Sequence, residues 1–131
     1  MIALDTNILI RLVVNDHPEQ SAMAENLVRG HRIFISKTVL MESEWVLRHS
    51  YRYSRERIAW FFGKLFEPWN TTIEHPEQVA KAIEWYTAGC DFADALHLAG
   101  CGDVTLHTFD RKFCKQAREA GIAPEVRVWD V

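Results

Sequence analysis

The sequence predicts an α/β fold in which a mainly parallel sheet is covered by helices on both faces. Short apolar runs alternate with longer segments whose apolar residues recur at helical spacing. Strands separated by helices imply right-handed crossovers, which place helices on both faces of a parallel sheet. The chain has 131 residues, of which 48% are hydrophobic and 25% charged. Because this length supports one sizeable core, we expect a single domain over residues 1–131.

The first half of the chain contains three apolar runs and four helical patterns. Pro18 is typical of a first helical turn, and Gly30 follows the end of that helix. Ser54 is a suitable N-cap for a helix in which phenylalanines recur. We expect, in order, a strand over Ile2–Leu4, a helix over Asn7–Val14, a helix from Pro18 toward Gly30, a strand over Arg32–Ser36, a helix over Val39–His49, a helix after Ser54 that reaches Phe66, and a short strand over Thr71–Ile73.

The second half continues the alternation. A helix begins at Pro76 and ends at Gly89, and Gly121 ends the last helix. We expect a helix over Asp91–Ala99, a strand over Val104–Phe109, a helix over Arg111–Ala120 and a final strand over Val126–Trp129. The tetrapeptide His-Pro-Glu-Gln at His17–Gln20 and His75–Gln78 is interpreted as a repeated helix start, since nothing around the copies matches.

Charge and cysteine content narrow the class of protein. A net charge of −3 excludes a protein that binds polyanions over its whole surface, so nucleic acid would need a local basic patch or metal ions. Cys90, Cys101 and Cys114 are odd in number and lack C-x-x-C spacing, which argues against a disulfide framework and a zinc site. No segment approaches the length of a membrane helix. A reducing cytoplasm is therefore the expected location.

Four acidic residues stand where a parallel sheet would place a site. Ligands bind beyond the carboxyl ends of such strands; Asp5 follows the first apolar run, and Asp110 follows Val104–Phe109. Either aspartate alone could equally be a helix cap. Glu42 and Asp94 lie on helix faces with apolar neighbours, where an unpaired carboxylate is costly, so each needs a cation or an arginine partner.

A divalent cation would satisfy all four carboxylates. Gathered without a cation, they would repel each other and raise some of their pKa values. Mg²⁺ and Mn²⁺ prefer oxygen ligands and support phosphodiester hydrolysis. Bound metal would also let an acidic pocket attract a polyanion. The pattern therefore favours a metal-dependent enzyme that acts on phosphodiesters.

Four segments together resemble the PIN-domain nucleases, and among them the VapC-type toxins of bacterial toxin–antitoxin pairs. These segments cover nearly the whole chain and read I-A-L-D-T-N-I-L at Ile2–Leu9, V-L-M-E-S-E-W-V-L-R at Val39–Arg48, D-F-A-D-A-L-H-L-A at Asp91–Ala99 and T-F-D-R-K-F at Thr108–Phe113. The resemblance implies a three-layer α/β/α sandwich around a mainly parallel sheet. It also implies cleavage of RNA with Mg²⁺ or Mn²⁺, a homodimer, and inhibition by a VapB-type antitoxin.

The resemblance also implies roles for particular residues. The catalytic and metal-binding acids of the family fall on Asp5, Glu42, Asp94 and Asp110. Among the accessory positions of the family, two match Thr6 and Asn7, which would help to position the first aspartate. A third matches Thr108, which precedes the last acid by two residues. Asp91 lies one helical turn before Asp94 and could add negative charge to the site. Glu44 points about 200° away from Glu42 on a helix, so only one can face the site, and the motif favours Glu42.

Other features keep alternatives open. Arg111, Lys112 and Lys115 are candidates for RNA binding or for ordinary solvated surface, and so are the arginines and tyrosines of residues 48–57. An aromatic series is too extensive to lie on one narrow face of a helix; it comprises Trp60, Phe61, Phe62, Phe66 and Trp69. We expect core packing to explain most of these residues, and a dimer or antitoxin surface to explain the others. His97 is interpreted as a packing residue. The rival function is a PIN-like RNA-binding or regulatory module with a weak or silent metal site.

Overall fold

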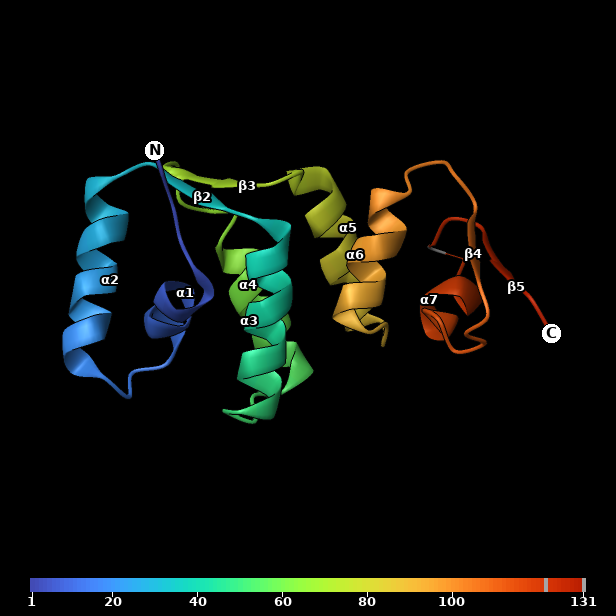
Figure 1. The fold of residues 1–131 in the computed structure, drawn as a ribbon, viewed down its shortest axis with the longest axis horizontal. Coiled ribbons are helices and arrows are strands. Elements are labelled where there is room, and N and C mark those ends of the chain that lie inside the picture. The colour runs from blue at the N-terminus through green and yellow to red at the C-terminus, as the bar shows by residue number, and fades with distance from the viewer. Residues whose placement is uncertain (122, 131) are drawn as a thin grey trace. The chain divides into compact units, whose positions relative to one another are not determined.

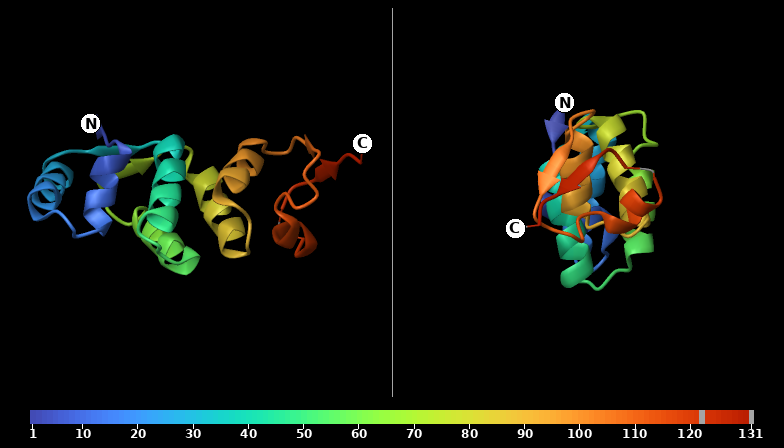
Figure 2. Two further views of the ribbon diagram at one scale, coloured as in Figure 1. Left: turned by 60° about the horizontal axis from the view of Figure 1, so that its bottom comes forward. Right: turned by 90° about the vertical axis from the view of Figure 1, so that its right-hand side faces the viewer.

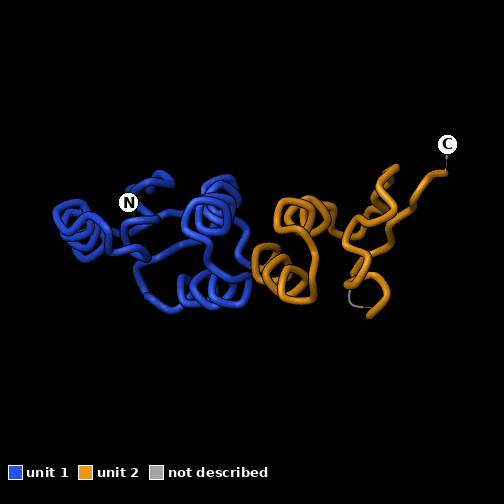
Figure 3. The backbone as a smooth tube through the Cα atoms, turned by 90° about the horizontal axis from the view of Figure 1, so that it is seen from below, with its two compact units in different colours: residues 1–76 blue, residues 77–131 orange. Residues whose placement is uncertain are grey.

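A computed structural model of the chain describes residues 1–121 and 123–130 and contains helices and parallel strands (Figure 1). The chain divides into two compact units, Met1–Pro76 and Glu77–Val131, which Figure 3 shows in blue and orange. The α/β class predicted from the sequence is confirmed, since every strand pairing is parallel. Within the described residues, no helix combines the length and the apolar character needed to cross a membrane.

The first unit is a three-stranded parallel sheet with four helices. The strands are ordered β1-β2-β3. In Figure 1 they run along the upper side of this unit, with α1, α3 and α4 below them. The elements are β1 Ile2–Ala3, α1 Thr6–Val13, α2 Pro18–Gly30, β2 Ile33–Ile35, α3 Lys37–His49, α4 Arg55–Lys64 and β3 Thr71–Ile73.

Strand register places polar residues in one row at the carboxyl edge of this sheet. Ile2 pairs with Ile33, and Ile35 pairs with Ile73. Continuing this register beyond the strands brings Asp5, Ser36 and Glu74 level with one another. Polar residues thus follow all three described strands of this unit, and Glu74 is one that the sequence analysis did not single out.

The core of the first unit lies where the sheet meets the helices. α1 packs against α2 and α3, and α3 packs against α4. Each large aliphatic side chain removed from water contributes roughly 1.5–3 kcal/mol, so this cluster holds the carboxyl edge rigidly. Its fully buried members are Leu9, Ile33, Ile35, Leu40, Leu47, Ile58 and Phe62.

The second unit has its own core and a two-stranded parallel sheet. β4 pairs with β5 from Leu106 opposite Val126 to Thr108 opposite Val128. Tyr86 and Phe92 meet edge to face, with ring centroids 5.3 Å apart, and both are fully buried. The right panel of Figure 2 shows β5, in red, toward the viewer. The elements are α5 Pro76–Thr87, α6 Phe92–Gly100, β4 Leu106–Thr108, α7 Lys115–Glu119 and β5 Val126–Val128.

The cysteine prediction is wrong, because Cys90 and Cys114 form a disulfide. Both side chains are buried and their Cα atoms lie 4.5 Å apart, although 24 positions separate them in sequence. Neither their number nor their spacing could reveal this contact, since the folding of the second unit creates it. Cys101 remains a free thiol and donates to the carbonyl oxygen of His97 at 3.3 Å.

Several element boundaries in the second unit also differ from the sequence prediction, most of all the starts of α7 and β4. The last helix begins at Lys115 instead of Arg111, because residues 111–114 form a turn and Cys114 has a left-handed φ of 44° that a helix cannot include. β4 begins at Leu106 instead of Val104, since residues 101–103 form a turn after α6 and Val104 lies in a bend. α6 itself continues to Gly100.

The aromatic series of residues 60–69 is less buried than predicted. Phe62 is fully buried and Phe61 is half-buried, whereas Trp60 and Trp69 are 65% and 91% exposed. α4 ends at Lys64, so the residues beyond it leave the helix face that packs on the core. Core packing therefore explains only part of this series.

Candidate active site

Asp5 begins α1 and presents its carboxylate at the carboxyl edge of the first sheet. The Asp5 Oδ1 atom accepts a hydrogen bond from the Thr6 backbone N–H at 2.7 Å, as an N-cap residue does. Asp5 is nevertheless an exposed residue. The two roles considered for Asp5, helix cap and site carboxylate, are thus compatible.

Thr6 connects α1 to the second acidic residue of this unit. The buried Thr6 hydroxyl donates a hydrogen bond to Glu42 Oε1 on α3. The sequence analysis expected Thr6 to help position Asp5. Its backbone N–H contacts the Asp5 carboxylate, and its side chain in addition holds Glu42. A contact over 36 positions has no local sequence signal, because it depends on the packing of α1 against α3.

A cleft opens beside Asp5 and Glu42. Its volume is about 360 Å³, and the first unit alone supplies its walls. Two of the four predicted accessory residues, Thr6 and Asn7, line it, and so do residues that the sequence analysis did not assign to the site. The lining comprises Asp5, Thr6, Asn7, Ile10, Arg11, Glu42, Trp45, Val46 and Tyr51.

Glu42 and Glu44 have different environments on α3. The prediction placed Glu42 inward beside apolar residues, but Glu42 is exposed and Glu44 is the buried acid, at 3% exposure. Arg48 Nε contacts Glu44 Oε2 at 2.6 Å, so an ion pair one turn along the helix compensates the buried charge. The choice of Glu42 over Glu44 as the residue beside Asp5 agrees with this arrangement.

In the second unit, Asp91 and Asp94 occupy the first turn of α6. Asp91 is the N-cap, and its Oδ2 accepts from the Asp94 backbone N–H at 3.1 Å. Partial burial raises the pKa of Asp94 above its ordinary value of 3.8, and the charges of Asp91 and Asp110 raise it further, while His97 opposes them. Asp94 and Asp110 are therefore close enough for their charges to repel each other.

The raised pKa of Asp94 has a consequence for stability. The folded chain binds the Asp94 proton more tightly than the unfolded chain does, so this carboxyl contributes stability below its ordinary pKa of 3.8. That contribution is lost as the pH rises through the raised pKa. At neutral pH the ionised Asp94 is a destabilising group that a bound cation would relieve.

Asp110 is held in a turn that follows β4. Its backbone N–H donates to Thr108 Oγ1 at 3.0 Å, and its Oδ1 accepts from the Lys112 backbone N–H at 2.9 Å. Thr108 therefore acts through the main chain of Asp110, two residues later, where the resemblance placed a hydroxyl residue. This local hydrogen bonding explains why residues 111–114 form a turn.

The basic residues after Asp110 are exposed. Arg111 pairs with Asp130, and Lys115 Nζ lies 3.9 Å from Glu119 Oε1 across one helical turn. Surface pairs of this kind contribute about 0–1 kcal/mol, so both cations can exchange their partners for a phosphate. Lys112 is also exposed. Their assignment to RNA binding stays a prediction.

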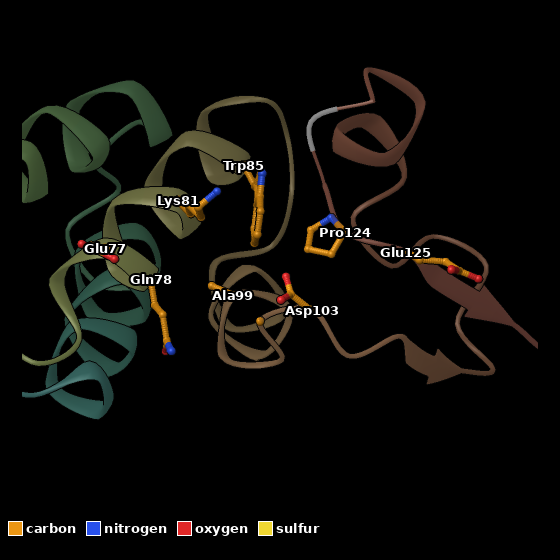
Figure 4. A pocket seen from close by; sticks show the side chains of 9 residues that line it. Glu77, Gln78, Lys81, Trp85, Ala99, Asp103, Pro124 and Glu125 are labelled. Atoms are coloured by element: carbon orange, nitrogen blue, oxygen red, sulfur yellow. The ribbon is translucent and has the colours of Figure 1, made fainter.

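One cleft of the second unit does not contain the predicted acids. It has a volume of about 460 Å³, and Figure 4 shows Lys81 and Trp85 of α5 on one side and Pro124 and Glu125, which precede β5, on the other. None of the predicted site residues lines it. In the part of the chain that the structure describes, no three His, Cys, Asp or Glu side chains form a ready metal cage. Each unit instead presents two of the four predicted carboxylates.

Comparison with known proteins identifies the class. The family model for the PIN domain matches residues 2–119 and runs through both units without interruption. The chain belongs to the PIN domain family. PIN domains are generally nucleases, hydrolases that act on nucleic acids and commonly use divalent metals. No curated protein matches the chain.

Proposed function

We propose that this protein is a Mg²⁺- or Mn²⁺-dependent endoribonuclease and the toxin of a VapBC-type toxin–antitoxin pair. The proposed catalytic and metal-binding residues are Asp5, Glu42, Asp94 and Asp110. The observation that carries the proposal is the presentation of two carboxylates by each unit of a PIN-family chain. We further propose that the two units together form one domain over residues 1–131.

The donor set fits a hard divalent cation. Asp5 and Glu42 are exposed carboxylates beside one cleft, and all four residues offer oxygen, the ligand that Mg²⁺ and Mn²⁺ prefer. Partial burial, and after it the charges of Asp91 and Asp110, raise the pKa of Asp94, and a bound cation would favour the ionised form again. When bound, such a cation supplies Lewis-acid stabilisation of phosphate charge and acidifies water.

The side chains of the chain itself orient this chemistry. Thr6 holds one Glu42 oxygen and leaves the other free, and the main-chain hydrogen bonds of Asp110 hold its carboxylate in the turn. Asp91 adds negative charge next to Asp94, which strengthens the attraction for a cation. Arg111, Lys112 and Lys115 are proposed to contact RNA phosphates, since their charges are exposed.

RNA cleavage by matched variants tests the proposal. Mixed cellular RNA is incubated with Mg²⁺ or Mn²⁺ and the wild type, Asp5→Asn, Asp94→Asn or the control Asp103→Asn. Asparagine retains the N-cap at position 5, so Asp5→Asn removes charge without removing the start of α1. Asp103 is an exposed aspartate of the other cleft. We expect metal-dependent cleavage by the wild type and the control, and at least a hundredfold loss in the two site variants.

Two outcomes would contradict the nuclease proposal. Equal cleavage by all four proteins without metal would remove the four carboxylates from the mechanism. RNA binding without cleavage by any of them would favour the RNA-binding or regulatory module. A calorimetric titration with Mn²⁺ distinguishes a metal-dependent nuclease from an RNA-binding module. For the nuclease, the site variants are expected to lose affinity for the ion while the control retains it.

The proposed partners are a second copy of the chain and a VapB-type antitoxin. Trp69 lines an apolar groove of about 420 Å³ in the first unit with Leu12, Leu65 and Pro68. An exposed tryptophan beside such a groove supports a protein contact. Light scattering measures the molar mass in solution, so a comparison of the wild type with Trp69→Asp tests the homodimer. A small neighbouring reading frame that encodes a DNA-binding segment would support the antitoxin. Cytoplasmic location is part of the same proposal.

A further inference from the structure

We propose that the cleft beside Asp5 and Glu42 binds one nucleobase of a single-stranded RNA, with Trp45 as its stacking surface. The inference rests on the proposed function, because it assigns the substrate contact next to the same carboxylates. All the residues concerned belong to the first unit.

The cleft has the size and composition of a small-molecule site. Its volume of about 360 Å³ lies within the range of roughly 300–1,000 Å³ that is usual for such sites. Apolar and aromatic walls come from Ile10, Trp45, Val46 and Tyr51, and polar groups come from Asn7. A flat aromatic base needs this combination of an apolar surface and a few edge contacts.

Trp45 is placed to stack a base next to the carboxylates. It lies three residues after Glu42 on α3, so the two side chains share one helix face. Trp45 is 56% exposed and lines the cleft, and its ring meets the tilted ring of His49 at 4.5 Å between centroids. The His49 contact supports the indole while more than half of its surface stays available to a ligand.

The part of the lining that includes Tyr51 and Arg11 is held by a hydrogen-bonded network. The Tyr51 hydroxyl donates to Asp16 Oδ2 at 3.1 Å, and Arg11 contacts the other Asp16 oxygen. Arg11 Nε also donates to Gln20 Oε1 at 2.8 Å. Asp16 compensates the charge of Arg11, so this wall contributes a fixed shape more than a phosphate contact. A preformed wall lowers the conformational cost of binding a base.

These features select unpaired RNA over a duplex. In an A-form helix the bases are stacked on one another and their major-groove edges are out of reach of side chains. A splayed base can lie on Trp45 and meet the Asn7 amide, which offers both a donor and an acceptor. Its flanking phosphate would then lie next to Asp5 and Glu42.

Equilibrium binding in Ca²⁺ tests the inference without cleavage, because Ca²⁺ neutralises the carboxylates but does not impose the octahedral geometry of Mg²⁺. A short fluorescent single-stranded RNA is titrated with wild type, Trp45→Ala, Trp45→Phe and the control Trp60→Ala, and fluorescence anisotropy is measured. Trp60 is 65% exposed on α4 of the same unit and does not line the cleft. We expect Kd to rise about tenfold for Trp45→Ala, to rise less than threefold for Trp45→Phe, and to stay unchanged for Trp60→Ala.

An RNA with a single abasic position distinguishes stacking from general damage. If a base occupies the cleft, some abasic positions weaken wild-type binding but have no further effect on Trp45→Ala. Circular dichroism verifies that each variant is folded. An unchanged Kd for Trp45→Ala, an equal effect of Trp60→Ala, or no RNA binding by the wild type would each overturn the inference.

The two proposals fail in different ways. Trp45-dependent RNA binding without cleavage in Mg²⁺ or Mn²⁺ would support the base site and contradict the nuclease. Metal-dependent cleavage with a KM that Trp45→Ala leaves unchanged would support the nuclease and contradict the base site.

Discussion

Reduction of the Cys90–Cys114 disulfide is expected to lower the free energy of unfolding of the second unit. The bond spans 24 positions, and the loss of loop-closure entropy for a loop of that length corresponds to about 3.5 kcal/mol at 25 °C. Both sulfur-bearing side chains are buried at 2% and 3% exposure, so the reduced thiols can stay in the same apolar surroundings. The entropy of the unfolded chain should therefore dominate the change.

The disulfide also joins the two segments that present the acids of this unit. Cys90 immediately precedes the N-cap of α6, and Cys114 ends the turn that follows Asp110. Its loss is expected to weaken the mutual placement of Asp94 and Asp110. We therefore expect lower affinity for Mn²⁺ after reduction, in addition to lower stability.

Urea unfolding with and without reductant measures the effect. With a slope of about 1–3 kcal/mol per molar urea, the wild-type midpoint should fall by at least about 1 M on reduction. The double variant Cys90→Ala/Cys114→Ala should have the lower midpoint even without reductant, and reductant should not change it. The midpoint of Cys101→Ala should fall on reduction as that of the wild type does. A wild-type midpoint that reductant leaves unchanged would refute the reasoning.

Three further sets of variants test the acidic residues and their supports. Asp94→Asn is expected to raise the urea midpoint of the metal-free protein at about pH 7. At about pH 3 it should leave the midpoint unchanged, because the carboxyl is then protonated in the folded and in the unfolded chain. Equal shifts of the midpoint at both pH values would contradict this prediction. Thr6→Val should cost about 1 kcal/mol and weaken Mn²⁺ binding because it frees Glu42, whereas Thr6→Ser should retain both properties. Glu44→Gln should cost about 2 kcal/mol in urea unfolding and leave RNA cleavage intact, since it disrupts a buried ion pair. Glu42→Gln should instead abolish RNA cleavage and leave the stability unchanged. Loss of cleavage in both glutamine variants would contradict the assignment of a structural role to Glu44 and a site role to Glu42.

Much of the fold could be predicted from local sequence patterns. Pro18, Gly30 and Ser54 define helix ends because their effects on the backbone are local, and α2 and α4 begin where these residues indicate. Likewise, Asp5 and Asp110 follow strands in the sequence and lie at the carboxyl ends of β1 and β4 in the structure. The family motifs rest on the same short-range order, and the PIN domain match over residues 2–119 agrees with them.

The sequence by itself determined the order of helices and strands, the α/β class and the identity of the candidate acids. Only the tertiary structure decided that Thr6 holds Glu42, that Glu44 is the buried acid, and that Cys90 bonds to Cys114. Helix starts and strand ends depend on the conformational preferences of residues that lie only a few positions apart in the sequence. Residues that lie 24 or 36 positions apart come into contact only because the packing of the helices brings them together, and no local sequence pattern predicts such a contact.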